Sequence, residues 1–385
     1  MVPSEYTNRR LKKITIIGAY SASLINFRGD LISDLVRGGY CVRTIADIPS
    51  PKVLTKLREL GADHKVVSFH RRGLNPVADF ITFINLLKVL WYERPDIVFS
   101  YTIKPVIWGG LACMILGIKH VSLITGIGSS LQSKRGFKNS LVRLIVLFLY
   151  RVILTHAKAV IFQNYDNLDL FKNKRLIRSQ QAVVVNGSGV NTNVFSYSAP
   201  SIKKYKFLCV ARLLKEKGIH EFIMAAEQIK ALYPDTEFQL LGGEEKLGDG
   251  IPLSLINRMH EDGIITYFGE VENVIPYLVE SSVFILPSYH EGLPRSTLEA
   301  MSIGRAIITT DAPGCRETVE QGINGFLVEV ANVRHLVEKI KYFIKNPIKI
   351  SEMGVESRNI VIKRYDVRII NSQLLDVIEN VLSVR

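Results

Sequence analysis

Short apolar segments alternate with helix-like segments along the first half of the chain. Residues 14–20, 95–101, 120–126, 159–164 and 182–189 each form a continuous or nearly continuous apolar run. Such strands are typical of a parallel sheet that helices cover on both faces, because neither side of the strand meets water. The alternation therefore predicts an α/β fold for this part of the chain.

The same pattern restarts in the second half of the chain. Predicted strands there cover residues 206–213, 238–243, 265–270, 282–288 and 305–311. A chain of 385 residues also exceeds the size at which a single hydrophobic core keeps growing. We therefore expect two similar, Rossmann-like βα domains.

The two series of strands are separated by a polar, turn-rich stretch near residues 190–203. We place an N-terminal domain at residues 1–195 and a C-terminal domain at residues 196–362. Residues 363–385 have the pattern of an amphipathic helix that packs back on the first domain. Because open α/β sheets bind ligands beyond the carboxyl ends of their strands, two facing domains would form a cleft between these ends.

The net charge of +13 is distributed unevenly. Residues 1–195 contain 27 Lys+Arg and 11 Asp+Glu, whereas the rest of the chain contains 22 and 25. The first domain is therefore expected to face an anion, and nucleic acid, a membrane surface and a phosphorylated substrate are the candidates. The chain lacks basic segments interleaved with aromatic residues and recognition-helix motifs, which argues against nucleic acid.

The cysteines and the start of the chain indicate the cytoplasm. The first apolar run is too short for the core of a signal peptide and is followed by no small-residue cleavage site. The cysteines are far apart in the sequence, at Cys41, Cys113, Cys209 and Cys315. This spacing predicts buried free thiols in a reducing compartment.

The stretch HEGLPRSTLEAM, residues 290–301, predicts an anion site at the start of a helix. We expect a loop at residues 288–291, a helix that begins at Pro294, and a helix end at Gly304. The first amides of a helix have no carbonyl partner within it and attract anions. The amides expected to bind phosphate here are those of Gly292, Leu293, Arg295 and Ser296.

Two glutamates flank this helix start. Glu291 in the loop could accept hydrogen bonds from sugar hydroxyls, and Glu299 inside the helix could accept them from a ribose. The alternative is that Glu291 is only a helix-terminus charge and Glu299 a surface residue.

A second cluster, residues 210–221, could hold a diphosphate. Arg212 ends a predicted strand and Lys217 comes just before a helix, so that a guanidinium fork and a point charge would neutralise the phosphates. The alternative is a solvated basic loop.

These motifs together resemble glycosyltransferase family 4, whose members are retaining enzymes with the GT-B fold. The resemblance is carried by Glu291 and Glu299 with seven residues between them, by Arg212 with Lys217-Gly218, by residues 184–195 and, most specifically, by residues 287–329. It extends over most of the chain, from about residue 12 to residue 345. The chain looks like the branch that builds bacterial surface polysaccharides on lipid-diphosphate carriers.

The resemblance implies a role for each motif. Arg212 and Lys217 would hold the donor diphosphate, Glu299 the ribose, and Glu291 the sugar hydroxyls near the reacting carbon. The base would lie in loops after two strands, near Gly242, Gly243, Gly269 and Val271. The loop with Gly18 and Tyr20 would approach the diphosphate or the acceptor, and Lys104 would serve a phosphate or the acceptor.

The first domain departs from the family in one respect. Many members have a histidine at the reaction centre, but residues 100–104 contain none, and His120 at the start of a strand is predicted to be structural. A metal-binding DxD pair is also missing, because Asp47, Asp79 and Asp96 are scattered. We therefore expect no metal or other cofactor, with the cations taking the place of a metal ion.

The implied reaction is transfer of a hexose or N-acetylhexosamine, such as N-acetylgalactosamine, from a nucleoside diphosphate, such as UDP. The acceptor would be a polyprenyl-diphosphate-linked saccharide in O-antigen or capsule synthesis. The alternatives are a GT-B sugar-nucleotide epimerase and a non-catalytic, membrane-associated binding protein.

Residues 131–160 combine apolar residues with cations. The apolar run interrupted by arginines, residues 141–154, has 14 residues, fewer than the roughly 20 that a membrane-spanning helix needs. We expect a helix that lies on the anionic inner face of the cytoplasmic membrane, and the alternative is a buried helix with a basic rim. The cations assigned to this surface are Lys134, Arg135, Lys138, Arg143 and Arg151.

Overall fold

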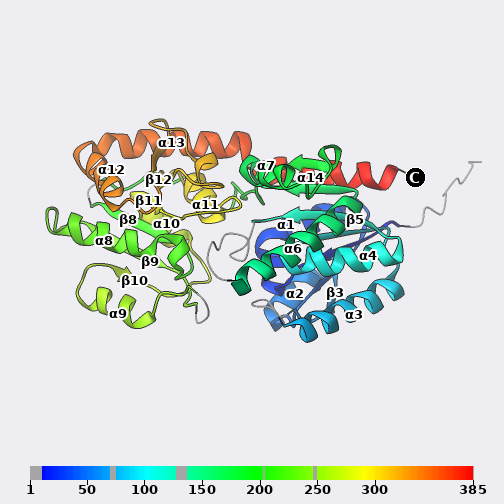
Figure 1. Ribbon diagram of the computed structural model, residues 1–385. Coiled ribbons are helices and arrows are strands. Elements are labelled where there is room, and N and C mark those ends of the chain that lie inside the picture. Colours follow the sequence, from blue (N-terminus) through cyan, green and yellow to red (C-terminus); the bar gives the residue numbers. More distant parts are fainter. Residues whose placement is uncertain (1–10, 70–74, 127–136, 203, 246–248, 385) are drawn as a thin grey trace, which may run out of the picture. The chain divides into compact units, whose positions relative to one another are not determined.

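The computed structural model describes residues 11–69, 75–126, 137–202, 204–245 and 249–384, without the side chains of residues 137–142. Its contacts divide into two compact α/β units (Figure 1). The N-terminal unit comprises residues 1–185 and 371–385, and the C-terminal unit comprises residues 186–370.

The N-terminal unit contains a parallel sheet, whose strand order among the described residues is β3-β2-β1-β4-β5-β6-β7. The strands are β1 (Lys13–Ile17), β2 (Cys41–Ala46), β3 (Asp63–Val66), β4 (Ile97–Tyr101), β5 (Lys119–Ile124), β6 (Ala159–Phe162) and β7 (Ala182–Val184). The helices are α1 (Ser21–Arg37), α2 (Pro51–Glu59), α3 (Pro76–Glu93), α4 (Gly110–Leu116), α6 (Phe137–His156) and α7 (Tyr165–Asn173), and the shorter turns are the π-helical η1 (Pro105–Gly109) and the 3-10 turn η2 (Ser179–Gln181). The parallel sheet with helices confirms the predicted fold class.

The last helix of the chain, α14 (Val367–Ser383), returns to the N-terminal unit as predicted. Asn371 Nδ2 donates a hydrogen bond to Asp34 Oδ2 at 2.6 Å, and Tyr40 Oη donates to Glu379 Oε1 at 3.2 Å. Lys119 Nζ donates to carbonyl oxygens near the end of the helix.

His120 is a core residue of the N-terminal sheet, which confirms that it is structural. Its side chain is buried, with Nε2 2.6 Å from Ser100 Oγ and Nδ1 3.4 Å from Ser122 Oγ. A Cβ at Gly110 would lie 2.7 Å from the imidazole Cε1 atom, so that this glycine makes room for the ring. Burial lowers the pKa of His120 to about 3.

The buried imidazole should make the stability of the chain depend on pH. Because the folded pKa lies below the unfolded value, His120 favours the native state fully above about pH 6.5, and this contribution is lost as the pH falls towards about 3. Between these limits the free energy of unfolding of the wild type should fall faster than that of His120→Gln, by about 1.4 kcal/mol per pH unit. Urea midpoints measured from pH 7 to pH 5 check this, and parallel curves would contradict it.

The C-terminal unit contains a second parallel sheet, with the strand order β10-β9-β8-β11-β12-β13 among the described residues. The strands are β8 (Lys206–Val210), β9 (Glu237–Leu241), β10 (Thr266–Tyr267), β11 (Val283–Leu286), β12 (Ala306–Thr310) and β13 (Gly325–Val328). The helices are α8 (Ile219–Lys230), α9 (Leu253–Glu261), α10 (Ile275–Glu280), α11 (Arg295–Ile303), α12 (Val333–Lys345) and α13 (Pro347–Arg364), with the 3-10 turns η3 (Lys215–Lys217) and η4 (Arg316–Thr318).

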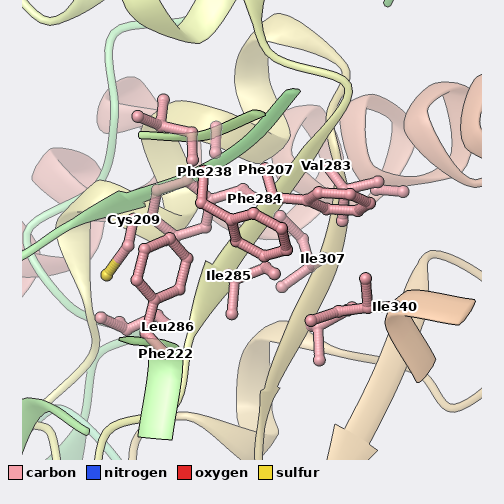
Figure 2. Packing of buried hydrophobic residues seen from close by; sticks show 14 of the residues in the cluster. Phe207, Cys209, Phe222, Phe238, Val283, Phe284, Ile285, Leu286, Ile307 and Ile340 are labelled. Atoms are coloured by element: carbon pink, nitrogen blue, oxygen red, sulfur yellow. The ribbon is translucent and has the colours of Figure 1, made fainter. Parts of the chain in front are cut away.

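Phenylalanines pack with aliphatic residues in the core of this unit (Figure 2). The rings of Phe207 and Phe238 stack with their centroids 5.0 Å apart, and Phe222 meets Phe238 edge-on at 5.7 Å. All three side chains are buried, and burial of each contributes about 1.5–3 kcal/mol. The core thus holds β8 and β9 firmly, and with them the loops at their carboxyl ends.

The cysteines are free, and Cys113, Cys209 and Cys315 are buried as predicted. The prediction was wrong for Cys41, which is exposed at the start of β2. The first buried residue of this strand is the next one, Val42.

Candidate active site

The loops after β8, β9 and β10 contact one another at the carboxyl edge of the C-terminal sheet. The amide of Gly242 donates to Gly269 O at 2.8 Å, and the amide of Leu213 donates to Gly243 O at 3.1 Å. Gly242 has a φ of +151°, and a side chain there would overlap the carbonyl oxygen of Ala211. The glycines predicted to line a base therefore lie together, and Val271 nearby packs against the core.

The loop after β11 is fixed on two sides. The amide of Tyr289 donates to Glu216 O at 2.8 Å, and the amide of Glu291 donates to Pro313 O at 2.9 Å, in the loop after β12. Ser288 Oγ lies 2.9 Å from Glu291 Oε1 and donates to it. Backbone and side chain together thus orient the Glu291 carboxylate.

Lys217 and Glu291 form an ion pair at this edge, with 2.6 Å between Nζ and Oε1. The two side chains are only 13% and 16% exposed. The alternative of a solvated basic loop is therefore wrong for Lys217. The pair places a cation and a hydrogen-bond acceptor side by side. Their predicted contacts with a diphosphate and a sugar stay predictions.

Arg212 points to a different partner. Its Nη1 donates to Glu245 Oε2 at 3.2 Å, and its side chain is 59% exposed. The structure thus brings Lys217 and Glu291 together, whereas the guanidinium of Arg212 is engaged by Glu245. Its predicted contact with a diphosphate stays a prediction.

The helix α11 begins at Arg295, and Pro294 is its N-cap residue. The prediction that Pro294 is the first helical residue was wrong by one position. Pro294 supplies no side-chain cap, and the first turn, which includes Ser296, contains no acidic residue. Gly292 and Leu293 before it are buried. Since amides at a helix start lack carbonyl partners within the helix, this terminus suits an anion.

Glu299 is a largely buried residue of α11. Its side chain is 14% exposed, which excludes the surface alternative, and its Oε1 accepts a hydrogen bond from Arg295 Nε at 2.9 Å. Burial raises the pKa of the Glu299 carboxyl, and the Arg295 guanidinium opposes this rise. If Glu299 binds a ribose as predicted, ribose hydroxyls would replace part of its contact with Arg295.

Gly218 fits closely against the loop after β11. It has a φ of +70°, and a Cβ there would overlap the Pro287 carbonyl oxygen. Gly263 has the same φ but open space around it. We expect Gly263→Ala to cost about 1–2 kcal/mol of stability from backbone strain alone, and Gly218→Ala to cost more and weaken donor binding. Thermal unfolding and nucleotide titration check this; equal effects of the two variants would contradict it.

One supporting contact was not predicted. Tyr289 Oη donates to Glu221 Oε1 at 2.5 Å. The pKa of the Tyr289 hydroxyl is raised, mainly by burial and to a smaller extent by the neighbouring Glu221 carboxylate. Tyr289 thereby ties the loop that carries Glu291 to α8. No sequence motif indicates this contact, because 68 positions separate its partners.

In the N-terminal unit, the loop after β1 lies beside the end of β4. The amide of Gly18 donates to Ile45 O at 2.9 Å, and the Tyr101 hydroxyl occupies the space that a Cβ at Gly18 would need. Tyr101 Oη lies 2.7 Å from Ser23 Oγ. Tyr20 in the same loop is 44% exposed, and its contact with substrate stays a prediction.

Lys104 follows β4 and is held by α3. Its Nζ lies 2.7 Å from Asp79 Oδ1, and the two side chains are 15% and 7% exposed. Thr102, two residues before Lys104, has a φ of +67°, which is rare and strained for a β-branched residue. The loop after β4 thus combines a strained backbone with a largely buried ion pair.

The basic segment is described in part. Lys134 and Arg135 lie outside the described residues, and Lys138 lies in α6 without a described side chain. Arg143 is partly buried and Arg151 is exposed, both on α6. Within the described ranges, every helix is too short or too polar to cross a bilayer.

Comparison with curated proteins shows the family. The model of the group 1 glycosyl transferases matches residues 193–361. The chain is 30% identical to the N,N'-diacetylbacillosaminyl-diphospho-undecaprenol α-1,3-N-acetylgalactosaminyltransferase of Campylobacter jejuni, over 87% of this chain and 90% of that protein. It is 25% identical to the UDP-Gal:α-D-GlcNAc-diphosphoundecaprenol α-1,3-galactosyltransferase of Escherichia coli, over 77% and 78% of the two chains.

Solved structures show the fold. HepE of Anabaena in complex with UDP-glucose matches with a TM-score of 0.76 and 18% identity, over 96% of this chain and 99% of that chain. Sucrose-phosphate synthase of Thermosynechococcus elongatus matches with a TM-score of 0.78 and 16% identity, over 97% and 100% of the chains. With the two α/β units of the GT-B fold and the similarity to curated enzymes over nearly the whole chain, this protein belongs to the group 1 glycosyl transferases.

Proposed function

We propose that the protein transfers a hexose or N-acetylhexosamine, with retention at the anomeric carbon, to a saccharide on polyprenyl diphosphate. The observation that carries this proposal is the 30% identity over 87% of the chain to an enzyme named for a diphospho-undecaprenol acceptor. The galactosyltransferase named above also has a diphosphoundecaprenol acceptor in its name.

Lys217 and the start of α11 would stabilise the leaving group. As the bond from sugar to phosphate breaks, negative charge develops on the diphosphate. A partly buried ammonium and helix-terminal amides stabilise such charge strongly, because they are oriented before the reaction begins. Arg212 would supply a second cation once its guanidinium leaves Glu245 and binds the phosphate.

Glu291 would bind the hydroxyls of the donor sugar, and Glu299 those of the ribose. The 2.6 Å contact between Glu291 and Lys217 supports this arrangement, since sugar and phosphate are neighbours in the donor. We propose that these residues act without a metal ion, because Lys217 supplies positive charge at the place where a cation would be required.

A uridine diphosphate and N-acetylgalactosamine are the proposed donor components. The Campylobacter jejuni relative is named an N-acetylgalactosaminyltransferase, and the name of the Escherichia coli relative contains UDP-Gal. The solved structure of HepE contains UDP-glucose.

The enzyme would act at the inner face of the cytoplasmic membrane, where a lipid-linked acceptor is accessible. The cationic excess of residues 1–195 and the exposed Arg151 on α6 support peripheral binding to anionic lipid.

The test is incubation of the protein with a panel of nucleotide sugars and undecaprenyl-diphosphate saccharides, followed by mass analysis. We expect one saccharide product that has gained an N-acetylhexosamine, together with released UDP. Conversion of a nucleotide sugar to its epimer in the absence of any acceptor would identify an epimerase instead. Failure of the whole panel to yield a longer saccharide would reject the proposal.

A further inference from the structure

The helix α3 exposes several large apolar side chains on its outward face. Its exposed apolar residues are Val77 (70% exposed), Phe80 (61%), Ile81 (54%), Trp91 (54%) and Tyr92 (84%). The buried residues of α3, on the opposite side, are Asp79, Thr82, Leu86 and Leu90. Asn85 and Lys88 on α3 are also exposed. An exposed cluster of large apolar side chains is nevertheless normally covered by protein or by lipid. The outward face of α3 therefore requires an explanation.

Two helices in the same unit also expose apolar side chains. Within the N-terminal unit α4 contacts both α3 and α6 (Figure 1). The exposed apolar residues on these helices are Ile115 (57%), Leu144 (64%), Ile145 (47%) and Phe148 (66%). We refer to these four residues and the five of α3 as the apolar face.

The described charged side chains on the helices of the apolar face are mostly cations, namely Lys88 on α3 and Arg143 and Arg151 on α6. Between Asp96 and Asp166 the sequence contains eight lysines and arginines and no acidic residue. This interval includes α4 and α6. On α3 itself, Asp79 is buried against Lys104, and Glu93 pairs with Arg43. An apolar surface rimmed by cations matches an anionic bilayer, which offers hydrocarbon beneath negative headgroups.

The ends of α3 suit a membrane interface. Trp91 and Tyr92 close the helix, and aromatic residues with a polar group prefer the headgroup level of a bilayer. The Arg94 guanidinium lies 4.0 Å from the Trp91 ring centroid, which keeps positive charge at the same level. At the other end, Asp79 joins α3 to Lys104 after β4, so that the apolar face is attached to the loop predicted to approach the acceptor.

We propose that α3 is a membrane-docking helix, which inserts its outward face into the interface of an anionic leaflet together with exposed residues of α4 and α6. This inference deepens the proposed function, because it rests on a lipid-linked acceptor that must be reached at the bilayer. The cations attract the protein to the leaflet, and the apolar side chains of α3 supply the contact with hydrocarbon.

The first test is vesicle binding by the variant Phe80→Ser/Ile81→Ser. We expect about a tenfold or greater loss of affinity for vesicles of phosphatidylcholine with phosphatidylglycerol, because two apolar side chains no longer leave water. The matched control is Ile348→Ser/Ile362→Ser, at exposed positions of α13 in the C-terminal unit, which should bind as the wild type does. Equal binding by all three proteins would overturn the proposal.

The second test uses Trp91, one of the two tryptophans in the chain. We expect vesicles to shift its emission to shorter wavelength, and acyl-chain-brominated lipid to quench it, relative to a Trp91→Phe control that retains only Trp108. A vesicle-bound protein with unquenched Trp91 would overturn the proposal. So would a wild-type dimer in solution that Phe80→Ser/Ile81→Ser converts to a monomer, because the apolar face would then join two copies of the chain.

An acceptor with a short, water-soluble prenyl chain separates this inference from the proposed function. Phe80→Ser/Ile81→Ser should transfer sugar to it at the wild-type rate, since the acceptor then needs no bilayer. If the wild type elongates no acceptor while the vesicle and fluorescence results hold, the proposed function fails and membrane docking stands. If transfer occurs but binding to vesicles is unaffected by the variant, the docking helix is rejected and the reaction stands.

Discussion

Replacement of Glu291 by glutamine is expected to lower the rate of sugar transfer about 100- to 1000-fold while the product nucleotide still binds. The carboxylate is held by the Ser288 hydroxyl and by Lys217, so that it is oriented before the donor arrives. Glutamine keeps an oxygen that can accept from Ser288 but removes the charge. Affinity for a nucleoside diphosphate should stay equal or rise, because a negative group next to the phosphates is gone.

Rates with a nucleotide-sugar donor and calorimetric titration with UDP measure the two effects separately. Glu280→Gln is a matched control, because Glu280 also pairs with a lysine, Lys206, but is 60% exposed at the end of α10. It should behave as the wild type does. Normal turnover of Glu291→Gln would show that the carboxylate does not act on the sugar.

Replacement of Lys217 by methionine is expected to weaken binding of UDP about 100-fold, because a partly buried ammonium contributes strongly to a bond with phosphate. The rate of transfer should fall at least as far, since the same charge stabilises the leaving group. The variant also leaves Glu291 without its cation next to the phosphates. The double variant Lys217→Met/Glu291→Gln should therefore bind UDP better than Lys217→Met alone.

Lys215→Met provides the control for this second variant. Lys215 lies in the same short turn, η3, but its side chain is exposed. Calorimetry with UDP on the wild type, Lys217→Met, Glu291→Gln and the double variant gives the coupling free energy between Lys217 and Glu291 directly. Unchanged UDP affinity in Lys217→Met would reject the assignment of this residue to the diphosphate.

The buried parallel strands could be predicted well, because their apolar runs are bounded by turn residues. Each predicted strand of the C-terminal unit from 206–213 to 305–311 corresponds to an observed one, although the observed strands are shorter. Strand β3 (Asp63–Val66) was not predicted, because it lies at the sheet edge and is mostly exposed, which removes the apolar pattern. Helix α3 was not predicted either, since its apolar residues are not confined to one face, which weakens the periodicity.

The types of residue in the candidate site could be predicted, but not their partners. Sequence spacing placed Lys217 and Glu291 in separate motifs, and their ion pair joins positions 74 apart. Arg212 and Glu245 likewise meet only through the loop contacts of neighbouring strands. Such pairings depend on the order of strands in the sheet, which no local pattern specifies.

The return of α14 has a consequence for how the polypeptide can be divided. Residues 371–385 complete the N-terminal unit, although the whole C-terminal unit separates them from Val185 in the sequence. A fragment that ended at Val185 would lack α14, and would leave Asp34 of α1 and Lys119 of β5 without their hydrogen-bond partners on that helix. The first unit therefore cannot finish folding on a ribosome until the helix after the C-terminal unit, α14, has been translated.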